Sequence, residues 1–237
     1  MGNSVGTQRP RSVVEFRSRE RGRIVTAMAG EMLRPPWEGV PAADPGQQEE
    51  LARRMGARRA LNLRREIAVV PGHFIDCGNE PGAKHEKAMN LRVADELTRR
   101  LTREDGFTVW RLERGGRLGW NAYKCAVAQQ FSPAVEVLEI HGQPGRDGRG
   151  GRAEGLVAWG GPADDTPLQR ELRREFGDHG NIAQLRGLGV PRAGGALSEA
   201  FDTDRVALLR TEREHAAFAD EVARRLRDAV MRSHGLA

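Results

Sequence analysis

The sequence predicts an α/β fold: a single three-layer domain in which a mainly parallel, twisted sheet is flanked by helices. Two observations lead to this prediction. Short apolar runs that stop at Gly or Pro, as buried strands do, alternate along the chain with longer segments of helical periodicity. The chain has 237 residues, which is enough for one substantial domain with an added segment and short for two full domains.

The first predicted strand, loop and helix begin at residue 67. Residues 67–70 are all apolar, and Pro71-Gly72 stops the strand so that His73 lies at its carboxyl end. Open α/β sheets bind their ligands at that edge. Glu86 lies near the start of the following helix, where it is either a functional carboxylate or an ordinary first-turn acid. The helix is predicted by apolar residues at three- and four-residue spacing, namely Leu91, Ala94, Leu97 and Leu101.

Two later strands also end in polar residues. Residues 134–141 form an apolar run that ends in His141 and breaks at Gly142, and residues 196–201 contain Glu199. Together with His73 and Glu86 these strand ends offer two His and two Glu. A catalytic zinc site has three protein ligands, of which His2Glu is one known set, and an open position for water. A further carboxylate outside the ligand set then serves as general base.

The motifs that carry this composition are Pro71-Gly72-His73, Glu86-Lys87 with Asn90-Leu91, Ile140-His141 and Glu199-Ala200-Phe201. In order and spacing they resemble the zinc-dependent N-acetylmuramoyl-L-alanine amidases, which cleave peptidoglycan. The resemblance covers roughly residues 67–230, with residues 106–112 and 155–159 similar to two further strands of that family. It implies that His73, Glu86 and His141 hold Zn2+ and that Glu199 is the general base. The substrate it implies is the amide between N-acetylmuramic acid and L-alanine.

The sequence departs from the family pattern beside these motifs. Val70 stands where the family usually has Asp, and Glu139 lies close before His141, where Ser is usual. By the two-residue period of a strand, Glu139 and His141 share one face, so Glu139 either orients the imidazole or is a partly exposed strand acid. Asn90 is a further candidate for contact with the site or the substrate.

Other assignments remain open. His73-Phe74-Ile75-Asp76 is similar to the His-x-x-Glu of zinc carboxypeptidases, which predicts a site of His73, Asp76 and His141 acting on the stem peptide. His179 is the alternative metal ligand if His141 is not one. Cys77 is either a ligand or a free thiol. The non-enzymatic alternative is a wall-binding or virion structural module.

The positive charge is concentrated at the amino terminus. Residues 1–66 hold 13 Arg and 8 acidic residues, which accounts for the whole net charge of +5. We predict a basic, mobile arm over 1–45, a helical lead-in over 46–66 and a zinc amidase-like catalytic domain over 67–237. The arm is either a solvated tail or a segment that adheres to the anionic cell envelope, and nucleic acid is not an expected partner.

The sequence has no convincing signal peptide and no run of transmembrane length. Residues 24–29 are apolar except for Thr26, but they are too few, and Glu31 follows shortly after them. We therefore expect synthesis in the cytoplasm and action on the cell wall, as a phage-type endolysin does.

Overall fold

The computed structural model describes nine stretches of the chain, namely residues 13–18, 24–28, 65–73, 83–114, 135–145, 154–158, 161–179, 188–192 and 194–236. Its strands form one sheet in the order β2-β1-β4-β3-β5-β7-β6. The strands are β1 (Val13–Ser18), β2 (Ile24–Met28), β3 (Glu66–Pro71), β4 (Thr108–Arg114), β5 (Glu136–Gln143), β6 (Gly155–Val157) and β7 (Ala196–Asp202). The helices are α3 (Ala83–Arg103), η1 (Pro162–Asp164), α5 (Pro167–Phe176), α7 (Gly189–Arg192), α8 (Thr203–Leu208) and α9 (Glu212–Ser233).

The sheet is mixed, which corrects the prediction of a mainly parallel sheet, while the α/β class is as predicted. The central strands β4, β3, β5 and β7 are parallel to one another. The pairs β1–β2, β1–β4 and β6–β7 at the two sides are antiparallel. Parallel neighbours need a long crossover such as α3, which links β3 to β4, whereas only five residues separate β1 from β2.

The strands β1 and β2 lie within residues 1–45, for which the sequence analysis predicts a basic, mobile arm. Their pairing extends the sheet beyond β4. In β1 the sequence Val14-Glu15-Phe16-Arg17 alternates apolar and charged residues, as a strand does. The predicted division into domains remains a prediction, and the lead-in over 46–64 lies outside the described residues.

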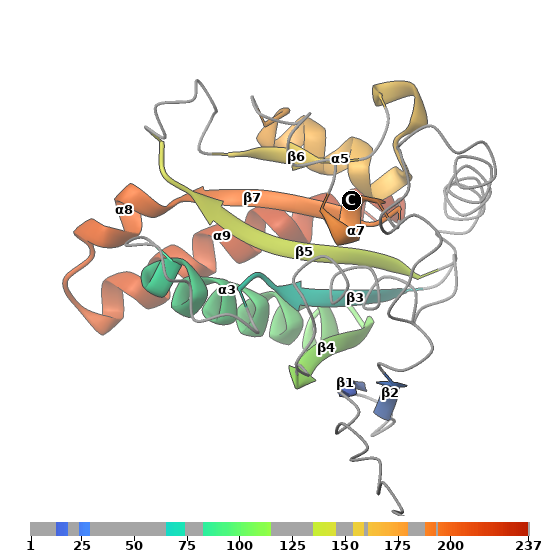
Figure 1. Cartoon of the computed structure of the whole chain (residues 1–237), viewed down its shortest axis with the longest axis horizontal. Helices are drawn as coiled ribbons and strands as arrows, with labels where there is room; N and C mark the ends of the chain where they lie inside the picture. Colours follow the sequence, from blue (N-terminus) through green and yellow to red (C-terminus); the bar gives the residue numbers. More distant parts are fainter. Residues whose placement is uncertain are drawn as a thin grey trace, which may run out of the picture.

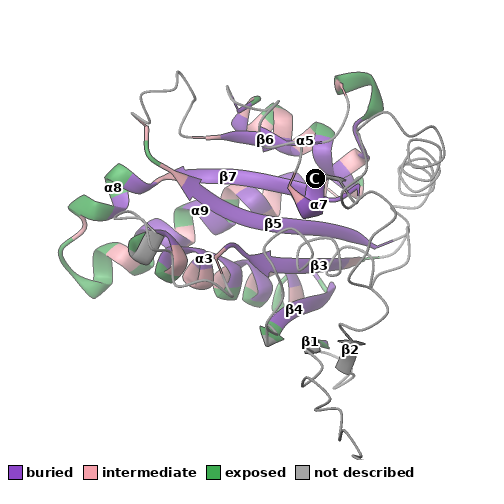
Figure 2. Cartoon of the chain, in the orientation of Figure 1, coloured by how far each residue is buried: buried purple, intermediate pink, exposed green. Residues whose placement is uncertain are grey.

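The helices α3, α5 and α9 pack on one face of the sheet. Side chains from all three helices join alternate residues of the central strands, such as Val69 and Ile140, in one buried cluster. Figure 1 shows α3 and α9 running along the sheet, and Figure 2 shows the central strands buried while the outward sides of both helices are exposed. The third layer of the predicted fold stays a prediction.

The long helices begin and end where their sequences indicate. In α9 a capping box joins Thr211 and Glu214 at the first turn. The apolar residues of α9 at four-residue spacing are all buried, namely Phe218, Val222, Leu226 and Val230. The last turn of α3 carries Arg100 and Arg103, which suit the negative end of the helix dipole. None of the helices in the described part of the chain is long and apolar enough to cross a membrane.

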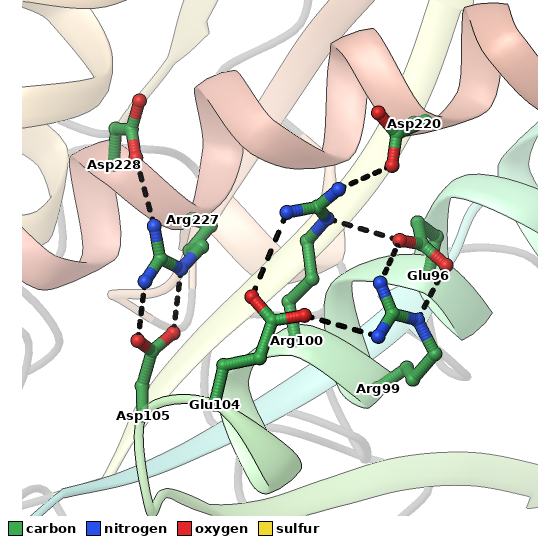
Figure 3. Close-up of polar contacts among 8 residues, drawn as sticks. All are labelled: Glu96, Arg99, Arg100, Glu104, Asp105, Asp220, Arg227 and Asp228. Carbon is green, nitrogen blue, oxygen red and sulfur yellow. Dashed lines mark hydrogen bonds and ion pairs between the residues drawn. The ribbon is translucent and has the colours of Figure 1, made fainter.

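Ion pairs join α3 to α9 on their outer sides, and we call these residues the α3–α9 charge network. Arg100 of α3 contacts Asp220 of α9, and Arg227 of α9 contacts Asp105 just after α3 (Figure 3). Glu96 and Glu104 each contact both Arg99 and Arg100. The network consists of Glu96, Arg99, Arg100, Glu104, Asp105, Asp220, Arg227 and Asp228.

Candidate metal centre

Three potential metal ligands meet where β3 and β5 end and α3 begins. His73 follows β3, His141 lies in β5, and Glu86 is in the first turn of α3. One ligand atom from each residue lies within 4.8 Å of the others. These three residues are the ones for which the family resemblance implies zinc binding, and the fold brings them together from three separate elements.

Glu86 bridges the two histidines. Its Oε2 lies 2.9 Å from Nε2 of His73, and its Oε1 lies 2.9 Å from Nδ1 of His141. The backbone N–H of Gly142 donates to Oε1 at 3.2 Å. Asn90, one turn later in α3, donates from Nδ2 to the same oxygen at 3.4 Å and to the carbonyl oxygen of Gly72 at 3.2 Å. Asn90 therefore ties the helix to the loop that carries His73.

The carboxyl group of Glu86 is strongly stabilised in its charged form. Burial alone would raise its pKa, but the hydrogen bonds from His141 and His73, together with the positive charge that these rings can carry, hold the pKa well below the usual range. A carboxylate that stays ionised and faces two imidazoles is a suitable metal ligand.

Glu139 contacts His141 from the other side of its ring. Its Oε1 lies 2.9 Å from Nε2 of His141, and the residue is only 1% exposed. The strand period had placed these two side chains on the same face of β5. Of the two interpretations of Glu139, the partly exposed acid does not fit this burial.

Close backbone packing holds the His141 ring in place. The N–H of Gly72 donates to the carbonyl oxygen of Ile140 at 2.7 Å, which brings β3 against the end of β5. A Cβ atom on Gly72 would lie 2.6 Å from both Cε1 and Nε2 of His141. The next residue, His73, has a positive φ of 55°, a conformation uncommon for residues other than glycine. The chain therefore turns sharply just where it presents a ligand.

Glu199 lies on β7, the strand next to β5. In the parallel register Glu199 is the partner of His141, so their side chains leave the same face on strands about 4.8 Å apart. Glu199 is buried, with 6% exposure. Among the described residues it is not one of the three whose ligand atoms cluster. Its role as general base stays a prediction.

The remaining sequence candidates do not join the cluster or fall outside the described residues. Asp76 and Cys77 lie in the stretch 74–82, which is outside the described residues. His179 follows α5, is buried, and donates its backbone N–H to Leu156 at 3.3 Å. Within the described residues the potential ligand cluster contains His141 and excludes His179. His179 therefore does not replace His141.

Sequence reasoning missed the contributions of two glycines. Gly72 and Gly142 were interpreted only as the ends of strands, yet one packs on the His141 ring and the other donates to Glu86. A Cβ on Gly142 would meet the ring of Phe201 at 2.2 Å, so this position also requires glycine. The signal that could have found them is their position, because each directly adjoins a candidate histidine in the sequence.

The donor set fits a zinc ion. Two imidazole nitrogens and one carboxylate oxygen from three elements form a His2Glu set, which leaves a position open for water or substrate. The same set also suits non-haem iron, so the residues alone define a divalent metal site more firmly than they define zinc.

Comparison with known proteins yields one similar solved structure. It is the crystal structure of an N-acetylmuramoyl-L-alanine amidase from Clostridium difficile 630, which is 19% identical to this chain; the match covers 72% of this chain and 96% of that chain, with a TM-score of 0.48. No family model and no curated protein matches the sequence.

Proposed function

We propose that this protein is a zinc hydrolase that cleaves the amide between N-acetylmuramic acid and L-alanine in peptidoglycan. The observation that carries the proposal is the meeting of His73, Glu86 and His141 at the carboxyl edge of the sheet, with their ligand atoms within 4.8 Å of one another. The choice of substrate rests on the sequence resemblance to the zinc amidases, whose motifs contain these residues in the same order.

The ligand atoms follow from the contacts in the site. Nε2 of His73, Nδ1 of His141 and one carboxylate oxygen of Glu86 would hold the zinc ion, because these atoms already face one another. A zinc ion with an open position polarises a carbonyl oxygen and makes water more acidic, to a pKa of about 7. Asn90 and the N–H of Gly142 keep Glu86 in place through hydrogen bonds to its Oε1.

Glu199 is the residue proposed to move the proton. Its carboxylate would accept a proton from the attacking water, whose oxygen forms the new bond to the carbonyl carbon of the lactyl group. The same proton then passes to the nitrogen of L-alanine as the C–N bond breaks, so the products are a carboxylate on the sugar and a free amino group on the peptide. Support for this role comes from the register, which sets Glu199 beside His141 in a buried position.

The biological setting is a further part of the proposal. Lysis of the cell wall by a phage-type endolysin, and adhesion of the basic segment 1–45 to an anionic envelope surface, are the roles that the sequence favours. Lysis depends on the amidase activity, and adhesion depends on the positive charge of that segment.

The test is mass spectrometry of purified peptidoglycan after digestion with the full chain, with and without a chelator. We expect free stem peptides that begin with L-alanine, their loss on chelation and their return when zinc is added. His141→Ala protein, purified in the same way, is the control for a contaminating hydrolase. Shortened stems that remain attached to glycan would instead indicate the peptidase alternative, and an unchanged sacculus would favour a wall-binding module.

A further inference from the structure

The His141 ring is held between two carboxylates. Nδ1 faces Oε1 of Glu86 at 2.9 Å, and Nε2 faces Oε1 of Glu139 at 2.9 Å. Glu86 also meets His73, so Nδ1 is the nitrogen that faces the ligand cluster, whereas Nε2 faces Glu139, which is not one of its members. The two sides of the ring therefore face different environments.

A neutral imidazole carries one N–H, on either nitrogen. A metal is bound through the nitrogen that lacks the proton. If Nδ1 is the ligand atom, the proton must be on Nε2, where Oε1 of Glu139 accepts it. Both nitrogens face a carboxylate oxygen at 2.9 Å, so the bound cation is what distinguishes them. With a metal at Nδ1, the lone pair of Nδ1 would face the cation, whereas a lone pair on Nε2 would face the carboxylate of Glu139, which is repulsive.

The ring also has little freedom to turn over. The backbone of Gly72 packs so closely on Cε1 and Nε2 that a single added Cβ would lie 2.6 Å from both atoms. Turning the ring by half a rotation would put carbon atoms opposite both carboxylates and break both contacts. Packing therefore favours the observed orientation, in which Nδ1 faces Glu86.

We propose that Glu139 is a positioning residue that keeps the proton of His141 on Nε2 and thereby commits Nδ1 to the metal. This inference rests on the metal site of the proposed function. It gives the two histidines different ligand atoms, because His73 meets Glu86 through Nε2. It also assigns a role to Glu139, at a place where the amidases that this sequence resembles usually have Ser.

Loss of the acceptor should weaken metal binding. Removal of the group that fixes a metal-binding histidine typically lowers metal affinity by about 10- to 100-fold. We expect this loss for Glu139→Leu, which removes the acceptor, and a smaller loss for Glu139→Gln, whose amide oxygen can still accept from Nε2. The control is Glu136→Gln, which changes another buried glutamate of β5, also 1% exposed, that faces the opposite side of the strand.

The first measurement is the zinc affinity of the full chain, by competition with a chromophoric chelator. Wild type and Glu136→Gln should bind equally, and Glu139→Leu should bind about 10- to 100-fold more weakly. Equal affinity of Glu139→Leu and wild type would overturn the inference. If Glu139→Leu does not fold, the comparison is made with Glu139→Gln, which keeps nearly the same shape.

The second measurement reports the tautomer and does not depend on folding of a variant. Long-range ¹H–¹⁵N correlation of zinc-loaded wild-type protein labelled in its histidines should show two metal-bound rings, one bound through Nδ1 with Nε2 protonated and one bound through Nε2. Two rings bound through the same type of nitrogen would contradict the proposal. In Glu139→Gln only the Nδ1-bound ring should shift.

These readouts separate this inference from the proposed function. Zinc binding with the expected tautomers, but without cleavage of peptidoglycan, would support the role of Glu139 and refute the amidase. Wild-type protein that binds no zinc would overturn both.

Discussion

Two regions of the molecule gather charged side chains, and they do so in different ways. In the α3–α9 charge network, carboxylates pair with guanidinium groups on the helix surface, and Arg99 at its margin has a side chain that is 42% exposed (Figure 3). The second region, which we call the strand-end cluster, consists of His73, Glu86, Glu139 and His141. Its two carboxylates are buried, and the contacts described above join them to imidazoles. Arginine is permanently charged and binds no metal, whereas a neutral histidine offers a lone pair.

The difference shows what each region can do. Exposed ion pairs contribute about 0–1 kcal/mol each to the free energy of unfolding, so each exposed pair of the network stabilises the packing of the two helices only slightly. Buried carboxylates with perturbed pKa values are expensive for stability and are concentrated at functional sites. Substitutions in the strand-end cluster should therefore change metal binding and catalysis above all. Substitutions in the network should change only the free energy of unfolding.

The largest expected effect separates catalysis from metal binding within the cluster region. Glu199→Gln should lower the release of stem peptides by about 10²- to 10⁴-fold, because it removes the carboxylate that we propose as the proton acceptor. Zinc content, measured by inductively coupled plasma mass spectrometry, should stay at the wild-type level. His73→Ala and His141→Ala should lose both zinc and activity. Glu199→Gln protein that keeps even a tenth of wild-type activity would exclude Glu199 as the base.

The next prediction tests the close packing on the His141 ring. Gly72→Ala adds a Cβ that would lie 2.6 Å from the ring and from the carbonyl oxygen of Ile140. We expect a loss of about 1–3 kcal/mol in the free energy of unfolding, as for other overpacked sites, and weaker zinc binding. The control is Gly161→Ala, where an added Cβ meets nothing within 4 Å. Equal stability and zinc affinity of the two variants would show that the ring is free to move.

The most buried pair of the network provides the comparison for stability. Asp105 has a side chain that is 4% exposed, and it accepts a hydrogen bond from Nε of Arg227 at 2.7 Å. Asp105→Ala leaves that guanidinium only the 3.5 Å contact with Asp228 within the network and should cost about 1–3 kcal/mol in urea unfolding. Zinc content should not change. A loss of zinc in this variant would mean that the two regions are coupled.

The sequence predicted the elements that hold the site better than it predicted their contacts. The strands that deliver His73, His141 and Glu199 were found because apolar runs ended at Gly or Pro or matched a family motif. The two-residue period of a strand predicted that Glu139 and His141 lie on the same face of β5. By contrast, the hydrogen bond from Gly142 to Glu86 joins residues 56 positions apart, and no local pattern contains it.

The sheet illustrates the same limit. Alternation of strands and helices predicted parallel neighbours, and this is true of β3, β4, β5 and β7. The orientation of the outer strands depends on pairing between distant segments. The antiparallel pairing of β1 with β2 and β4, and of β6 with β7, makes the sheet mixed where a mainly parallel one was predicted. The sequence therefore indicates which segments form strands, but not which strands lie side by side in the sheet.

A pH prediction tests the surface pairs at the other side of α9. Burial would raise the pKa of Glu175, but hydrogen bonds and charges from Arg225 and Arg232 lower it below its ordinary value of 4.5. A lowered pKa in the folded state stabilises the protein above about pH 4.5, and this contribution is lost as the pH falls through the folded value. The stability difference between wild type and Glu175→Gln in urea should therefore be greatest above that pH, at less than about 1 kcal/mol, and should shrink in acid. A difference that grows in acid would contradict the assigned direction.

The smallest effect is expected at the exposed margin of the network. Arg99 reaches Glu96 and Glu104, but its side chain is 42% exposed and competes with water and salt. Its partners also retain Arg100, so no carboxylate loses its last contact when Arg99 is removed. Arg99→Ala should change the free energy of unfolding by no more than about 0.5 kcal/mol and should leave zinc binding and peptide release unchanged. A loss as large as that of Asp105→Ala would mean that the network acts as one unit, and exposure would then be a poor guide to what its pairs contribute.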